Sequence, residues 1–83
     1  MRKSASKASE MIRKARKKKG WTQQELGTML GYGYGNFVGM MESSASKIPF
    51  DLIPRLCELL DLDPRKLLKE VMISRHPTVA KFL

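Results

Sequence analysis

The sequence is poor in the residue types that most enzymes and metalloproteins rely on. It contains one cysteine and one histidine, so no internal disulfide can form and no oxidising compartment is implied. Cys57 has no cysteine partner for a metal and no nearby histidine for nucleophilic chemistry, and His76 sits beside a proline near the end of the chain. The acidic residues are scattered, and helix capping or surface position explains most of them. We therefore expect no catalytic residues, no metal, no cofactor and no enzyme activity.

Long hydrophobic runs are missing as well. No apolar stretch approaches the roughly 18–20 residues of a membrane-spanning helix, and none follows the basic start of the chain as a signal peptide requires. The apolar content of 42% still allows a folded chain, and 83 residues make one domain near the lower size limit for a single core. We expect a soluble protein of the cytoplasm.

Acidic residues are scarcest at the start of the chain. Residues 1–19 hold nine lysines and arginines and one acid, whereas residues 20–83 hold seven of each sign, so the net charge of +8 belongs to the N-terminal segment. Such a concentrated basic block favours phosphate groups as partners. The alternative is a solvated helix face that only aids solubility.

What the sequence does have is helical periodicity, and no strand pattern or internal repeat accompanies it. The first helix is expected over residues 8–19, capped by Ser6 or Ser9 and ended by Gly20. Its inward stripe consists of apolar residues at helical spacing, namely Ala8, Met11, Ile12 and Ala15. Trp21, directly after this helix, is interpreted as a core anchor rather than a base-stacking residue.

Two further helices are expected after residue 49. Asp51 is predicted to cap the first of them, which places Pro54 at its third position, where the missing N–H does little harm. Asp63-Pro64 is a cap followed by a proline at the first helical position of the last helix, which continues to about Ile73. The inward stripes of the two helices are Ile53, Leu56, Cys57 and Leu60 in one, and Leu67, Leu68, Val71 and Met72 in the other.

The chain is organised around residues 20–49, which predict two short helices separated by a glycine-broken turn. Thr22 and Glu25, three residues apart, form a capping box, and Gly31 ends the first of the two helices. The second helix begins at Asn36 and ends near residues 43–44. Two short helices joined by a tight turn form a helix-turn-helix unit, whose second helix is shaped for the major groove of DNA. The predicted fold is all-α, a compact five-helix domain.

From residue 12 to residue 68 the chain resembles the Cro/repressor-type (XRE-like) helix-turn-helix family of phages and bacteria, and within it a subgroup with one extra residue in the inter-helix turn. The residues that carry the resemblance are Ile12, Arg16, Gly20, Thr22, Gln23, Glu25, Leu26, Leu30, Gly31, Val38, Met41, Glu42, Pro49, Leu56, Leu60, Asp63, Pro64, Leu67 and Leu68. The resemblance implies a DNA-binding transcription regulator. In this family an arginine on the first helix pairs with a glutamate on the reading helix, which implies a partly buried, bidentate ion pair between Arg16 and Glu42.

Candidate DNA contacts separate into residues that position the protein and residues that read bases. If Val38 and Met41 point inward, then Gly35, Asn36, Gly39 and Met40 point at the groove. Asn36 suits adenine and Met40 suits a thymine methyl group, while Tyr32 or Tyr34 in the turn could reach phosphate or a base edge. The positioning contacts are predicted at the start of the first short helix, in the loop after the second and in the basic segment: Gln23, Gln24, Ser46, Lys47, Arg2, Lys3, Lys7, Lys14, Lys17 and Lys18. Of these, the contact at Gln23 is also implied by the family resemblance.

These interpretations divide the chain into a flexible basic arm (1–7), a helix-turn-helix domain (8–74) and a tail (75–83) that can form one helical turn. Double-stranded DNA is the expected partner, with localisation at the nucleoid. The tail and the last helix carry apolar residues that predict a homodimer contact, namely Val71, Ile73, Val79, Phe82 and Leu83. The alternative function is a protein-interaction module (antitoxin-like, anti-repressor or adaptor) that docks a partner through Tyr32, Tyr34, Phe37 and Met40.

Overall fold

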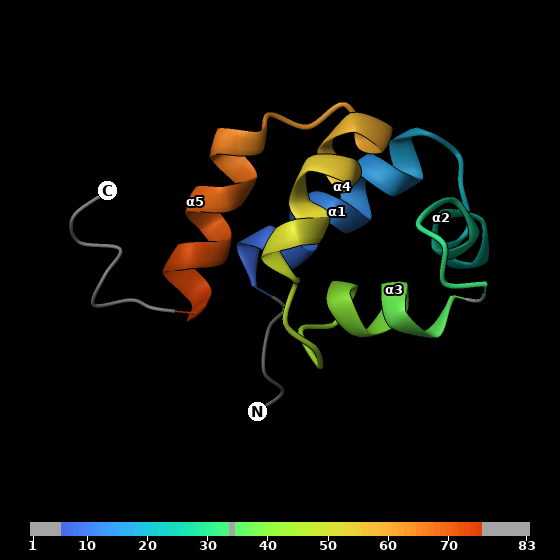
Figure 1. The fold of residues 1–83 in the computed structure, drawn as a ribbon, viewed down its shortest axis with the longest axis horizontal. Helices are drawn as coiled ribbons and strands as arrows, with labels where there is room; N and C mark the ends of the chain where they lie inside the picture. Colours follow the sequence, from blue (N-terminus) through green and yellow to red (C-terminus); the bar gives the residue numbers. More distant parts are fainter. Residues whose placement is uncertain (1–5, 34, 76–83) are drawn as a thin grey trace.

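The structure is a computed structural model that describes residues 6–33 and 35–75, and within these ranges every regular element is a helix. In chain order the elements are α1 (Lys7–Lys18), α2 (Gln23–Met29), α3 (Asn36–Glu42), the 3-10 turn η1 (Phe50–Leu52), α4 (Ile53–Leu60) and α5 (Pro64–Arg75). Figure 1 shows α3 along the lower edge of the molecule, with α2 at the right-hand end and α5 at the left-hand end. The predicted all-α, five-helix fold is confirmed.

Local capping residues set most of the helix boundaries. The Ser6 hydroxyl accepts a hydrogen bond from the amide of Ser9 and caps α1, and the Thr22–Glu25 capping box opens α2. Gly20 and Gly31 follow α1 and α2 with φ angles of +77° and +89°, a backbone conformation that glycine adopts without strain. Asp63 accepts a hydrogen bond from the amide of Arg65, so α5 starts at Pro64 as the sequence predicts.

The start of α4 differs from the prediction. Asp51 does not cap it, because Asp51 lies inside η1 and its side chain makes no capping hydrogen bond. The amide of Leu52 already bonds to the carbonyl of Pro49, so the chain is turning before the helix begins at Ile53. A capping residue needs extended backbone angles, and here Pro49 has them, with ψ of 136°. Pro54 is therefore the second residue of α4 rather than the third.

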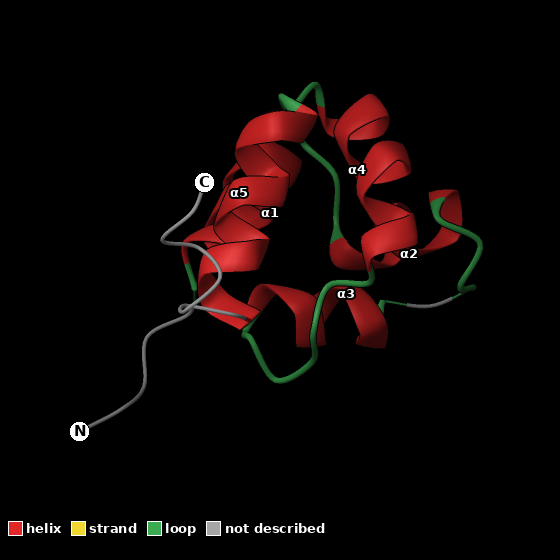
Figure 2. Ribbon diagram, turned by 60° about the vertical axis from the view of Figure 1, so that its left-hand side comes forward, coloured by secondary structure: helices red, strands yellow, loops and turns green. Residues whose placement is uncertain are grey.

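One apolar core joins the helices. α1 packs against α3, α4 and α5, and α2 packs against α3, an arrangement that Figure 2 shows from a second side. The core draws on the predicted inward stripes of α1 and α4, and it consists of Ala8, Ile12, Leu26, Val38, Met41, Ile48, Ile53, Leu56, Cys57, Leu60, Leu67 and Val71. Met11, Ala15 and Trp21 pack against it while partly buried, so Trp21 has the environment of a core anchor.

The lone cysteine belongs to this core. Burial raises the pKa of the Cys57 thiol, and the negative charge of Asp63 raises it further, so the group stays protonated and behaves as a small apolar residue. Within residues 6–33 and 35–75, no cluster of three histidine, cysteine or acidic side chains is placed to hold a metal ion. The helices of the same ranges are all too short or too polar to span a bilayer.

Candidate nucleic-acid interface

Two glycines determine how closely α3 approaches α2. A Cβ atom added to Gly35, the residue before α3, would lie 2.8 Å from the amide nitrogen of Gln24 and 2.9 Å from the carbonyl carbon of Gln23. One turn later, a Cβ atom on Gly39 would lie 3.2 Å from the side-chain oxygen of Gln23. A side chain at Gly35 would collide with rigid backbone, so only glycine lets α3 start directly against α2.

This close approach leaves a shallow cleft of about 490 Å³ between the two helices, here named the reading cleft. It is lined by Gln23, Gln24, Gly35, Asn36, Gly39, Met40 and Ser43. Val38 and Met41 are fully buried, so α3 has the orientation that the sequence predicts. Gly35 and Gly39 line the cleft as expected, although their main contact is with α2. The structure thus brings together the candidate contacts Gln23, Gln24, Asn36 and Met40.

Ser43 is a lining residue that the sequence interpretation missed. It follows Asn36 by seven residues, which is about two helical turns, and therefore lies on the same side of α3. Its hydroxyl donates to the carbonyl of Met40 and it is exposed. The helical spacing from Asn36 was the signal that could have found it.

A buried polar network fixes α3 against α1. The Nε atom of Arg16 donates to Oε2 of Glu42 at 2.6 Å, and Nη2 donates to Oε1 at 3.1 Å, which is the bidentate ion pair expected from the family resemblance. Arg16 is 8% exposed and Glu42 is 5% exposed. The remaining Arg16 nitrogen, Nη1, donates to the carbonyl of Trp21 at 2.6 Å. The guanidinium therefore links α1, the start of the helix-turn-helix unit and the end of α3.

The two glutamines at the start of α2 are already partly engaged within the protein. Gln23 donates from Nε2 to Oε1 of Glu42 at 3.1 Å, so it extends the ion-pair network across to α2. Gln24 donates from Nε2 to the carbonyl of Gly33 at 2.9 Å and so holds the inter-helix turn. Toward the other residues that the structure describes, each side chain makes no further hydrogen bond through its amide oxygen or its second N–H, and each is oriented before any ligand arrives.

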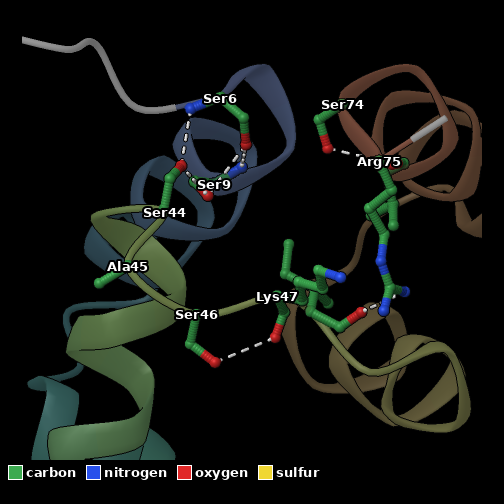
Figure 3. A pocket seen from close by; sticks show the side chains of 10 residues that line it. Ser6, Ser9, Ser44, Ala45, Ser46, Lys47, Ser74 and Arg75 are labelled. Carbon is green, nitrogen blue, oxygen red and sulfur yellow. Dashed lines mark hydrogen bonds between the residues drawn. The ribbon is translucent and has the colours of Figure 1, made fainter. Parts of the chain in front are cut away.

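The loop after α3 lies beside the start of α1. The backbone amide of Ser6 donates to the hydroxyl of Ser44 at 2.8 Å, and the hydroxyls of Ser9 and Ser44 are 2.9 Å apart. Figure 3 shows this serine cluster together with Ser46, Lys47 and Arg75 around one cavity of about 540 Å³. The point where the chain enters α1 is thus attached to the end of the helix-turn-helix unit.

The basic residues of α1 lie on different sides of the helix. Arg16 faces α3, whereas Lys14 and Lys18 line a groove with Leu60 and Leu62 on the other side of α1. Residues two apart on a helix point in nearly opposite directions, which explains why Lys14 is turned away from Arg16. Lys7 and Lys17 are exposed, and Arg2 and Lys3 lie outside the described residues. The basic segment is therefore not one uniform surface.

The structure describes only part of the turn between α2 and α3, which carries aromatic side chains. Tyr32 is exposed and its ring centroid lies 4.6 Å from that of Phe37, with the two planes tilted. Met40 is exposed on the same helix as Phe37. Tyr34, which was predicted as a contact, lies outside the described residues.

One residue predicted for a dimer contact is unavailable for it. Val71 is 1% exposed and belongs to the core, because α5 packs this side against the other helices. The large apolar residues that α5 leaves exposed are Leu68, at 44%, and Ile73, at 39%. Val79, Phe82, Leu83 and His76 lie outside the described residues.

A short helix held at a fixed angle on a second one across a tight turn is the arrangement of a helix-turn-helix unit, which in DNA-binding proteins places the second helix in the major groove. The comparison with known families agrees with this class. The chain belongs to the helix-turn-helix family, in its XRE-like form, since the family model described as "Helix-turn-helix" matches residues 12–67. This is a family of DNA-binding transcription regulators that are generally not enzymes. Searches of curated proteins and of solved structures give no match.

Proposed function

We propose that this DNA-binding protein is a transcription regulator of phage or bacterial type that docks α3 in the major groove and acts at the nucleoid in the cytoplasm. The observation that supports it best is the reading cleft, where Asn36 and Met40 of α3, and Ser43 directly after α3, line the same cleft as Gln23 and Gln24. The fixed angle between α2 and α3 means that binding need not order these helices first. A preorganised site binds with less entropic cost.

The side chains of the cleft suggest separate roles. Asn36 is exposed at the first position of α3 and offers the bidentate amide edge that fits adenine, and Met40 offers apolar contact to a thymine methyl group. Ser43, two turns along, adds one hydroxyl that can reach a base or a phosphate. With a single amide side chain on α3 for bidentate pairing, we expect α3 to read few base pairs directly.

Phosphate contacts are proposed on both sides of α3. Gln23 and Gln24 lie at the α2 side, while Ser46 and Lys47 lie in the loop that follows α3. Lys7, at the start of α1, is next in sequence to Ser6, whose amide bonds to Ser44, so the basic segment enters the fold beside this loop. The basic segment is then proposed to reach the DNA backbone next to the helix-turn-helix unit through Arg2, Lys3 and Lys7. Lys17 is proposed to add a phosphate contact from the exposed surface of α1.

A homodimer is proposed because one unit covers only a half-site, and paired units read half-sites about 34–36 Å apart. Leu68 and Ile73 are the exposed apolar residues of α5 that support such a contact. The second candidate function, a protein-interaction module, is favoured by two exposed side chains, Tyr32, whose ring packs against Phe37, and Met40 of the reading cleft.

The test is a binding titration of the full chain on random duplex DNA and on sequences selected from a genomic pool, at several salt concentrations. A specific regulator should prefer its selected sites by about 10³-fold or more. Asn36→Ala should cost about 1–3 kcal/mol on the selected site and relax the preference at one base pair. Glu58→Ala, on the exposed side of α4, is the control. The interaction module would be favoured if Asn36→Ala bound every DNA sequence as tightly as wild type does but no longer bound a protein partner.

A further inference from the structure

A second groove lies on the side of α1 that faces away from α3. Its volume is about 510 Å³, and its apolar floor is formed by Met11 and Ala15 of α1 together with Leu60 and Leu62 around the end of α4. Figures 1 and 2 both show α3 at one edge of the molecule and the connection between α4 and α5 at the opposite edge. The groove is therefore remote from the reading cleft.

Three lysines border this groove, which we name the lysine-rimmed groove. Lys14, Lys18 and Lys19 line it with a single acid, Asp61. Asp61 is already paired, because Lys19 Nζ lies 2.5 Å from its carboxylate. Lys14 and Lys18 form no ion pair with any residue of the ranges 6–33 and 35–75. The rim thus carries three lysines and one acid, a net of two positive charges, beside an apolar floor.

Neither DNA binding nor helix stability accounts for this combination. When α3 contacts DNA, Lys14 and Lys18 point away from it, since Arg16 on the other side of α1 is the residue that faces α3. A lysine in the last turn favours the helix dipole, which would explain Lys18 but not Lys14, one turn earlier. An apolar floor serves neither purpose.

We infer that the lysine-rimmed groove is a docking site for an acidic amphipathic helix of a partner protein. Met11 and Lys18 are seven residues apart, which is about 10 Å along α1, so the groove spans two helical turns. Two apolar side chains four residues apart on the partner span about 6 Å and fit within this length, and carboxylates flanking them would meet Lys14 and Lys18. Charge complementarity selects an acidic partner, and the position of the groove leaves it accessible while the protein is on DNA.

The experiment uses the full chain and a fluorescein-labelled 14-residue helical peptide with leucines at two positions four apart and glutamates around them. We expect saturable binding, seen by fluorescence anisotropy, and amide shift changes at Met11, Ala15 and Leu62 in NMR spectra. Lys14→Glu with Lys18→Glu should weaken peptide binding by about tenfold, which corresponds to about 1.4 kcal/mol, and should change DNA binding no more than a double variant with the same charge change elsewhere on the surface. The matched control is Lys66→Glu with Lys69→Glu on the exposed surface of α5, which should bind the peptide like wild type.

Several outcomes would overturn the inference. Equal weakening by both double variants would mean that the peptide responds only to overall charge. Undiminished binding of a peptide with serine in place of leucine would mean that the apolar floor plays no part. If duplex DNA displaces the peptide, and Lys14→Glu with Lys18→Glu weakens DNA binding more than Lys66→Glu with Lys69→Glu does, the lysines serve the phosphate backbone. Because both lysines are exposed, unfolding of the variant is not expected, and circular dichroism checks this.

Discussion

The packing of α1 against α4 and α5 and the packing of α3 on α2 use different means. In the first region, side chains such as Ile12, Leu56 and Leu67 are fully buried and fill the space between helices. In the second, α2 contributes one large buried side chain, Leu26, and the approach of α3 depends on Gly35 and on the network of Arg16, Glu42 and Gln23. One apolar core therefore runs through both regions, and in the second region glycine and polar contacts add to it.

The difference teaches which changes each region should tolerate. Apolar cores accept substitutions that conserve volume, because several packings of similar energy exist. A bidentate ion pair and a backbone contact have one geometry each, so they fix an angle rather than only contribute cohesion. The reading cleft lies in the region with the fixed angle, which suits the proposed role of this cleft in matching the DNA surface.

The largest effect is expected from the ion pair. Arg16→Met alone or Glu42→Leu alone should lower the free energy of unfolding by about 3–5 kcal/mol, because each strands a buried charge. The double variant should recover much of this decrease, since apolar side chains can replace a buried pair. Urea unfolding of the two single variants and the double variant measures this. If the effects of the two single variants on the free energy of unfolding are additive and each below about 1 kcal/mol, the Arg16–Glu42 ion pair does not fix the position of α3.

The second prediction compares the two glycines. Gly35→Ala should cost about 1–3 kcal/mol and reduce DNA binding, because the new Cβ atom meets the backbone of α2. Gly39→Ala is the matched control, since its Cβ atom meets only the end of the Gln23 side chain, while alanine gains about 0.5–1 kcal/mol in helix preference. Thermal unfolding of both variants tests the difference. Equal stabilities would mean that α3 can move away from α2 without cost.

The third prediction separates the basic residues by the region they serve. Neutralising Arg2, Lys3 and Lys7 should flatten the dependence of log affinity for DNA on log salt, by about 0.9 for each phosphate that the variant no longer neutralises. Neutralising Lys14 and Lys18 to glutamine should leave that slope unchanged, because these side chains line the groove on the other side of α1. Filter binding or anisotropy over a range of salt concentrations gives both slopes, and a slope that falls in the second variant contradicts the division.

The smallest effect concerns pH and the ion pair at the surface. The hydrogen bond and charge of Lys19 lower the pKa of Asp61 below its ordinary value of 3.8. A carboxyl group with a lowered folded-state pKa contributes stability above its unfolded pKa, and this contribution disappears as the pH falls through the folded value. Lys19→Met should therefore slightly flatten the decrease in stability on acidification below about pH 4. Chemical denaturation at pH 3 and pH 6 measures the change, which is small because the pair is exposed.

The amino-acid sequence by itself determined the helices and their ends. The Thr22–Glu25 capping box, the Ser6 cap and the glycines after α1 and α2 act within about four residues, so neighbouring sequence specifies them without reference to the rest of the fold. The apolar stripes of α1 and α4 were equally readable, because burial on a helix follows its period. The one misplaced start, at Asp51, came from a 3-10 turn that the spacing of capping residues does not reveal.

Only the tertiary structure decided which neighbour each side of a helix meets. Val71 and Leu68 belong to the same apolar pattern, yet one is in the core and the other is exposed, because α1 and α4 cover only one side of α5. Gly35 lines the reading cleft as the helical period predicts, but its contact with the backbone of α2 follows only from how the two helices cross. The contact between Ser9 and Ser44 joins residues 35 apart, and the two sides of α1 separate Arg16 from Lys14. Such contacts depend on helix crossings set by the whole core, so no local pattern can specify them.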